Sequence, residues 1–345
     1  MSAAIGIAKM IDRNRLQRSA LAGLAAAGFL LLPLCLPTAA QAKVTATVTA
    51  TAKVAATVDS TARIQALLDN PVNGVVNLPS GTFTIRPALR LQQAETIVGH
   101  NTTLTVAASS GDYAAVLQGA SPGTDLSGLS ITGVTFDQNA AANPITNVQA
   151  LYHGQPRFVI LVSKGTGISI TNDKFLNTNN VDTVVTGSAT GQATISGNQF
   201  TGVSTPWHDH SSVYTSGTGT TITNNTFSGS YDVTAIEVHG DQATVTGNKI
   251  SGYDRAINVV CSDTTFSKNT VTRALGPVDL WSIVAPGLHD VAVTGNTLRQ
   301  DLTGWSRQFR SLGLPMPSAP ATQQVFRDVS SKYPFVRITV SGNRS

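Results

Sequence analysis

Eight segments of this chain end in nearly the same four-residue phrase, and the spacing of these phrases constrains the fold more than any other feature. The last residues of the six inner phrases are separated by 25, 27, 23, 21 and 27 residues. A period of this size is typical of a solenoid, because one repeat cannot bury its apolar face and must stack on its neighbours. The phrases are ITGV (131–134), ITND (170–173), ISGN (195–198), ITNN (222–225), VTGN (245–248), FSKN (266–269), VTGN (293–296) and VSGN (340–343).

The residues around each phrase predict short strands. Thr, Val, Ile and Ser alternate with period two, and Gly and Asn interrupt the runs as turn residues do. The predicted fold is therefore all-β, a single-stranded right-handed parallel β-helix with a short N-terminal capping helix. Its recurring asparagines are expected to stack, coil on coil, as one internal ladder of amides. The predicted ladder consists of Asn198, Asn225, Asn248, Asn269 and Asn296.

Residues 1–42 resemble a secretory signal peptide. A basic stretch ending at Arg18 precedes an apolar run, and Ala40-Gln41-Ala42 fits the small-x-small pattern of a cleavage site. The apolar run is short for a membrane span and contains two prolines. Cleavage near Ala42 is therefore expected, followed by secretion to the extracellular space or the periplasm without stable membrane association. An uncleaved anchor is the alternative.

The leader also accounts for most of the positive charge. It holds four of the 23 basic residues and one of the 19 acidic residues, which leaves 19 basic and 18 acidic residues in the mature chain. A net charge near +1 gives no support to nucleic-acid binding, which requires a basic surface. No glycine-rich loop for a nucleotide cofactor is found. Cys261 becomes the only cysteine, so no intramolecular disulfide can form, and its apolar strand predicts a buried side chain.

The rest of the chain is predicted to form one domain, residues 58–345. Residues 43–57 are rich in Thr, Val and Ala and are either a linker or a first strand. Asp59 and Ser60 precede a short amphipathic helix, which would cover the unpaired strand edges at the open end of the solenoid. The last step of the repeat is 47 residues, about two coils. Residues 297–337 are therefore a long insertion over the solenoid or a capping segment that packs on its side or end.

A second set of residues, between positions 59 and 99, matches a known pattern. These residues are Asp59, Ile64, Gln65, Leu78, Pro79, Gly81, Thr82, Phe83, Leu89, Leu91 and Gly99. Together with the coils they resemble the pectate lyase superfamily, which includes polygalacturonase-like hydrolases and phage tailspikes. The resemblance implies a parallel β-helix that acts on polysaccharide or binds it. It does not select a reaction, because the superfamily contains lyases, hydrolases, epimerases and non-catalytic binders. The polygalacturonase catalytic pattern is missing, so no catalytic residue is transferred.

An aspartate recurs sixteen positions before the ladder residue in three successive coils. These aspartates are Asp182, Asp209 and Asp232. Equivalent residues of neighbouring coils lie about 4.8 Å apart, so three ionised carboxylates would repel unless one is protonated or a cation lies between them. Ca²⁺ is the expected ion, because it accepts oxygen ligands in irregular geometry. The alternative is that the aspartates cap turns.

A cluster of titratable residues surrounds two of these aspartates. In the strand that ends at His239, Ile236 and Val238 are expected to point into the core, so Glu237 and His239 would point outward. The same register would place Tyr214 and Asn258 beside Glu237. The candidate catalytic residues are His239, Tyr214, Glu237, Asp209, Asp232, His210 and Arg255, and the candidate substrate-binding residues are Trp207, His208, Asn258 and Asp254.

This cluster of outward residues favours a polysaccharide-active enzyme. The protein is expected to be a monomer. Elimination on a uronate polymer requires a base, an acid for the leaving oxygen and a group that neutralises the carboxylate. His239 or His210 would be the base, Tyr214 the acid, and Arg255 or a cation the neutralising group. The expected function is therefore a polysaccharide lyase. The alternatives are a glycoside hydrolase that uses two carboxylates of the aspartate column, and a non-catalytic glycan-binding or surface protein.

Overall fold

The computed structural model describes residues 58–145, 156–202, 210–311 and 326–345, with the main chain alone at residues 231, 232, 309 and 326–331. Within this part of the chain, Asp59–Ser345 forms one compact unit. The predicted signal peptide, residues 1–42, and residues 43–57 lie outside the described residues. No helix among the described residues is long and apolar enough to cross a membrane.

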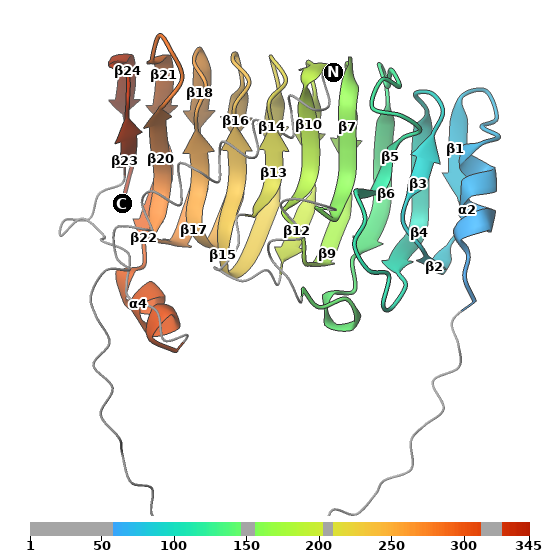
Figure 1. Ribbon diagram of the computed structural model, residues 1–345. Coiled ribbons are helices and arrows are strands. Elements are labelled where there is room, and N and C mark those ends of the chain that lie inside the picture. The colour runs from blue at the N-terminus through green and yellow to red at the C-terminus, as the bar shows by residue number, and fades with distance from the viewer. Residues whose placement is uncertain (1–57, 146–155, 203–209, 312–325) are drawn as a thin grey trace, which may run out of the picture. The chain divides into compact units, whose positions relative to one another are not determined.

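Each coil of the unit contributes one short strand to each of three columns of parallel strands, which we call the first, second and third sheets (Figure 1). The strands that contain the repeated phrases form the first sheet. They are β1 (Val75–Leu78), β4 (Thr96–Val106), β6 (Ser130–Asp137), β8 (Ser169–Thr171), β11 (Thr194–Ser196), β14 (Thr221–Thr223), β16 (Thr244–Thr246), β18 (Thr264–Ser267), β21 (Leu288–Thr294) and β24 (Phe335–Ser341).

The strands that follow the phrases form the second sheet, to which the long strands β4 and β6 also contribute their ends. The others are β2 (Gly81–Ile85), β9 (Lys174–Thr178), β12 (Gln199–Gly202), the start of β15 (Thr226–Val238), the start of β17 (Lys249–Val259), β19 (Thr270–Ala274) and β22 (Thr297–Gln300).

The third sheet closes each coil. It consists of β3 (Leu89–Leu91), β5 (Ala115–Gly119), β7 (Phe158–Thr166), β10 (Asp182–Gly191), β13 (Ser211–Thr215), the ends of β15 and β17, β20 (Gly276–Ser282) and β23 (Phe326–Ser331). In all three sheets every strand pairs in parallel with the equivalent strand of the next coil.

The core lies inside the coil and is built from stacked side chains, because equivalent inward residues repeat from strand to strand. Phe136, Phe175, Phe200 and Phe227 occupy one such position in the second sheet. Their ring centroids are 5.5, 4.7 and 4.6 Å apart, and the rings are nearly parallel. Cys261 is also buried, which raises the pKa of its thiol to about 12 and keeps it protonated at neutral pH.

The predicted ladder of amides is confirmed at the turn between the first and second sheets. Each Oδ1 accepts both the main-chain N–H and the side-chain N–H of the preceding ladder residue, at 2.8–3.0 Å. The ladder runs from Asn198 through the predicted asparagines to Asn343, one coil further than expected. At its other end Asp173 takes the place of an asparagine.

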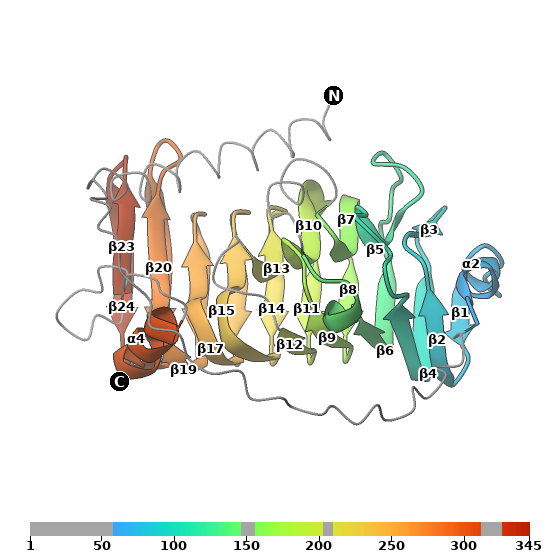
Figure 2. The same cartoon turned by 60° about the horizontal axis from the view of Figure 1, so that its bottom comes forward.

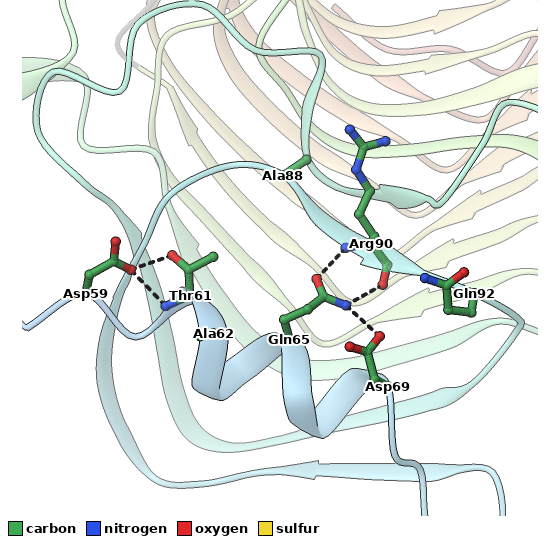
Figure 3. Close-up of a pocket in the computed structure, with 8 residues that line it drawn as sticks. All are labelled: Asp59, Thr61, Ala62, Gln65, Asp69, Ala88, Arg90 and Gln92. Carbon is green, nitrogen blue, oxygen red and sulfur yellow. Dashed lines mark hydrogen bonds between the residues drawn. The ribbon is translucent and has the colours of Figure 1, made fainter.

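A short helix covers the first coil, as the sequence predicted. α2 (Thr61–Leu68) buries Ile64 and Leu68 against the core. Asp59 precedes the N-cap residue Ser60, and its Oδ1 accepts the N–H of Thr61, the first residue of the helix, at 2.9 Å. An open pocket lies where the helix meets β3 (Figure 3), and its lining residues are Asp59, Thr61, Ala62, Gln65, Asp69, Ala88, Arg90 and Gln92.

The polar groups of this pocket hold the helix in place. The Gln65 side chain accepts the main-chain N–H of Arg90 at 2.8 Å, and it donates to the carbonyl oxygen of Arg90 at 2.8 Å and to Asp69 at 2.9 Å (Figure 3). Gln65 thus extends the edge of β3 as a strand would. We interpret the pocket as the seam between the cap and the first coil.

The 47-residue step at the end of the repeat is one coil with an insertion, although its length equals about two coils. Asn343 bonds directly to Asn296, and β24 pairs with β21. The insertion includes α4 (Leu302–Ser311), which lies beside β19 (Figure 2). Trp305 of α4 is fully buried and donates its Nε1–H to the carbonyl oxygen of Arg273 at 3.1 Å. Within residues 297–337, α4 therefore packs on the side of the solenoid, whereas β22, β23 and the start of β24 are strands of the solenoid itself.

Candidate functional site

The two longest connections of the coil, residues 138–157 and 301–325, both leave the second sheet and return to the third. Connections of this length in a compact fold often carry function, because the sheets beside them are rigid. The outer surface of the third sheet is therefore the expected location of a site. Most of the predicted site residues that are described lie on this sheet.

One outward-facing column of the third sheet is polar. Tyr214 of β13 pairs with Glu237 of β15, Glu237 with Asn258 of β17, and Asn258 with Asp279 of β20. Their chain neighbours, such as Ile236, belong to the core. The predicted alignment of Tyr214, Glu237 and Asn258 is confirmed, and Asp279 extends the column by one coil, or about 4.8 Å.

Glu237 joins two other side chains in a hydrogen-bonded row. Its Oε1 lies 2.7 Å from Nε2 of His239, and its Oε2 accepts the hydroxyl hydrogen of Ser211 at 2.8 Å. The side chain of Glu237 is 3% exposed, whereas that of His239 is 23% exposed. Because a carboxylate only accepts, Nε2 of a neutral His239 carries the hydrogen, and Nδ1 keeps its lone pair.

Tyr214 completes this group from the neighbouring coil. Its ring packs against the imidazole of His239, with centroids 4.9 Å apart and an interplanar angle of 37°. Tyr214 is half-buried, as is His239. A phenol and an oriented imidazole are therefore in contact at the surface of the third sheet, where one ligand can meet both.

A positive group lies on the next strands of the same sheet. Nε of Arg255 is 3.5 Å from Oδ2 of the fully buried Asp279, and its guanidinium carbon lies 5.5 Å from the ring centroid of Trp281. Nε and Nη1 of Arg255, Nε1 of Trp281 and Oδ1 of Asn258 are buried and make no hydrogen bond with the described residues. Buried polar atoms without a partner are unfavourable, and the side chain of Arg255 remains 15% exposed at this surface.

Three of these residues were not proposed as site residues from the sequence. They are Ser211, Asp279 and Trp281. Asp279 follows Asn258 by the length of one coil, so register could have found it. Trp281 is one of three tryptophans and lies on a strand of the same sheet. Ser211 carried no signal, because Thr and Ser are the ordinary residues of these coils.

The prediction that His210 could act as the base is wrong. It is fully buried, and its Nδ1 lies 3.1 Å from the carbonyl oxygen of Asn180. This main-chain carbonyl, which precedes β10, accepts the ring N–H, so the buried side chain of His210 does not reach the outward column. Asp254 is half-buried on β17, four residues before Asn258.

The predicted column of three aspartates is also wrong, in its first member. Asp182 pairs with Ser211, and Ser211 pairs with Thr234. Asp232 lies two residues before Thr234 and pairs instead with Tyr253. Asp182 is therefore two residues out of register with Asp232.

The offset arises from two extra residues near the end of β10. Thr186 pairs with Thr215, but Gly191 already pairs with Thr218. Five residues of one coil therefore match three of the next. The sixteen residues counted back from Asn198 to Asp182 include this irregularity. Equal spacing in the sequence therefore did not give equal positions in the sheet.

The remaining predicted residues cannot be placed in the same way. Trp207, His208 and Asp209 lie outside the described residues, and only the main chain of Asp232 is described. The calcium site therefore stays a prediction, with Asp209 and Asp232 as its protein ligands.

Another cluster of possible metal ligands occurs elsewhere among the described residues. One ligand atom each of Asp263, His289 and Asp290 lies within 4.8 Å of the others. However, Arg337 donates to both carboxylate oxygens of Asp290, and these bonds lower the pKa of Asp290 to about 2. The carboxylate of Asp290 is therefore already paired with a cationic side chain. We interpret the cluster as surface ion pairs that join the last coils.

A comparison with protein-family models agrees with the fold. The family model described as right handed beta helix region matches residues 158–297. The chain is also similar to the crystal structure of endo-xylogalacturonan hydrolase from Aspergillus tubingensis, with 13% sequence identity and a TM-score of 0.43 over 85% of this chain and 91% of that chain. No curated protein matches the sequence. The predicted fold class, a right-handed parallel β-helix, is confirmed.

Proposed function

We propose that this protein is a secreted polysaccharide lyase, which cleaves a uronate-containing polymer by β-elimination. The observation that carries the proposal is the contact between His239 and Glu237, in which a buried carboxylate holds a partly exposed imidazole at 2.7 Å. An imidazole oriented in this way is suited to act as a general base, because the carboxylate selects the tautomer and leaves the other nitrogen for the substrate.

In the proposed elimination from a 4-linked uronate, the rings of His239 and Tyr214 supply the base and the acid. Nδ1 of His239 takes the C5 proton, and the electron pair of the C–H bond forms the C4–C5 double bond. The bond from C4 to the glycosidic oxygen breaks, and Tyr214 donates the proton that this oxygen takes. The contact between the two rings supports these roles, because both groups lie within reach of one sugar residue.

The carboxylate of the uronate needs a positive partner, because neutralising it acidifies the C5 proton. Arg255 is proposed for this role. Its pairing with Asp279 and its position over Trp281 keep the guanidinium in one orientation. The side chain of Arg255 is 15% exposed, so it is partly accessible to a substrate carboxylate at this surface.

Hydrolysis receives less support from the described carboxylates. It requires a protonated acid and an ionised base or nucleophile, both open to the substrate. Both oxygens of Glu237 are already bonded, and Asp279 is fully buried next to Arg255. A hydrolase would therefore depend on Asp209 and Asp232, the pair that the sequence offers for that reaction.

The deciding experiment measures two products of the same digestion. Polymers of galacturonate, glucuronate, and mannuronate with guluronate are incubated with the mature protein. The unsaturated product is followed by its ultraviolet absorbance and new reducing ends by a colorimetric assay. A lyase yields both in equal amounts. Reducing ends without unsaturated product would favour the hydrolase, and neither product, with retained binding to a polymer, would favour a non-catalytic glycan-binding protein.

Secretion and calcium binding belong to this proposal as well. Removal of the leader near Ala42 would deliver the protein to the compartment in which such polymers occur, and mass spectrometry of the secreted protein tests the cleavage site. Ca²⁺ at Asp209 and Asp232 would bridge the protein to the anionic sugar. Calorimetric titration of EDTA-treated protein tests this binding, and activity unchanged by chelation would remove calcium from the mechanism.

A further inference from the structure

We propose that Ser211 is a positioning residue that holds His239 in a single tautomer through Glu237. The inference rests on the proposed role of His239 as a base, but its test does not require catalysis. Ser211 is fully buried on β13, one coil away from Glu237 on β15. Its Oγ donates to Oε2 of Glu237 at 2.8 Å, on the opposite side of the carboxylate from His239.

The two bonds share one carboxylate and therefore depend on each other. A carboxylate can rotate about its last side-chain torsion, which is broad rather than staggered. With Oε2 held by the Ser211 hydroxyl, Oε1 is the oxygen that faces Nε2 of His239. This arrangement favours the tautomer with hydrogen on Nε2 and the lone pair on Nδ1. Without the hydroxyl, the Glu237 carboxylate loses one of its two anchors and can move away from Nε2, and the ring of His239 can then adopt either tautomer.

The chain offers a matched control for this contact. Ser212, the next residue on β13, is 2% exposed, and its hydroxyl lies 3.0 Å from the hydroxyl of Tyr253 rather than from Glu237. Replacing Ser212 by alanine removes a buried hydroxyl of the same kind without touching the row that ends at His239. A general loss of packing in β13 would appear in both variants.

A conservative variant is also available at the same position. Thr234 pairs with Ser211 in the next coil and is fully buried there. Threonine is therefore compatible with this level of the third sheet, and Ser211→Thr keeps the hydroxyl. Ser211→Cys keeps the shape of serine but donates weakly, and it replaces Ser211→Ala if the alanine variant does not fold.

The test reads the tautomer directly. The ring nitrogens of His239 are observed by ¹⁵N NMR in the mature protein and its variants, at a pH where the ring is neutral, and are assigned with His239→Gln. Wild type, Ser211→Thr and Ser212→Ala should show hydrogen on Nε2 alone. Ser211→Ala should show both tautomers in exchange. Hydrogen confined to Nε2 in Ser211→Ala, or a mixture in Ser212→Ala as well, would overturn the proposal.

The kinetic consequence separates this inference from the proposed function. If the protein is a lyase, Ser211→Ala should lower kcat roughly 10- to 100-fold with KM unchanged. The position of the base affects the energy of the transition state and not the binding of the substrate. Ser211→Thr should restore most of the rate. If no lyase activity is found in any variant, the proposed function fails, and the NMR result still decides whether Ser211 positions His239.

Discussion

The main-chain N–H of Asp173 donates to Oδ1 of Asn198 at 2.8 Å, so an aspartate holds the first place in a ladder of asparagines. Oδ1 of Asp173 accepts the N–H of Val134, while its Oδ2 is buried and makes no hydrogen bond with the described residues. In the asparagines from Asn198 to Asn296 this second atom is an Nδ2 that donates to the next Oδ1. A charged Oδ2 would face an acceptor. Burial raises the pKa of Asp173 to about 7.

This aspartate should make stability depend on pH. In the unfolded chain its carboxyl titrates near pH 4, whereas in the folded protein the pKa is about 7. Because the folded state binds the proton more tightly, the contribution of Asp173 is complete below about pH 4, falls as the pH rises to about 7, and stays low above that.

Asp173→Asn should remove this loss. We expect the variant to gain about 1–4 kcal/mol of unfolding free energy near pH 8 and to gain little near pH 4. Urea unfolding at both pH values measures the difference. The reverse change, Asn248→Asp, places a carboxyl in the middle of the ladder and should destabilise the protein more at pH 8 than at pH 4. Equal shifts at both pH values would contradict the explanation.

The aromatic stack should be a major source of stability. Phe200 is 2% exposed and lies between Phe175 and Phe227. Phe200→Ala removes a ring that the neighbouring rings cannot replace, so we expect a loss of about 3–5 kcal/mol. Phe200→Leu keeps most of the volume and should lose less. Thermal unfolding of both variants measures the order, and equal losses would show that the stacking volume is not what matters.

The candidate base should be essential to the proposed reaction. His239→Ala should lower the rate of unsaturated product formation by about 10²–10⁴-fold, which is the usual contribution of a general base. Glu237→Gln should reduce it as well, because an amide can donate to the ring and no longer selects the tautomer. His100→Ala serves as the control, because His100 is an exposed residue of β4 near the N-terminal end of the solenoid. Loss of activity in the control would point to instability.

Helix α4 should depend on a single anchor. Trp305 is fully buried and bonds to the carbonyl oxygen of Arg273. Trp305→Phe loses the hydrogen bond and should cost about 1 kcal/mol, whereas Trp305→Ala also loses the packing and should cost about 3–5 kcal/mol. Limited proteolysis should then cut the alanine variant within α4 first. If both variants resist protease as the wild type does, the helix has another anchor.

The repeat and its ladder were predictable because both depend on local sequence. Alternation of apolar and polar residues decides which side chains of a strand face inward, and an asparagine at a fixed place in each coil can bond only to its equivalents. These rules placed Asn198 to Asn296 in one line and Glu237 beside Tyr214 and Asn258. They also predicted α2, whose Ile64 and Leu68 lie on one face.

The errors in the site have a different origin. Alignment between coils is set by every residue that lies between two strands, so the two extra residues after Thr186 moved Asp182 away from the level of Asp232. The direction of His210 was decided by the carbonyl oxygen of Asn180, a main-chain group that comes from another coil.

By itself, the sequence determined that this chain coils into a parallel β-helix, where its amides stack, and which strand carries outward charged groups. Only the tertiary structure decided that Glu237 lies between Ser211 and His239, and that Arg255 pairs with Asp279 over Trp281. The physical reason is that period and pattern act within a coil, whereas a hydrogen bond between coils depends on positions within a few tenths of an ångström, which loop lengths and packing set together.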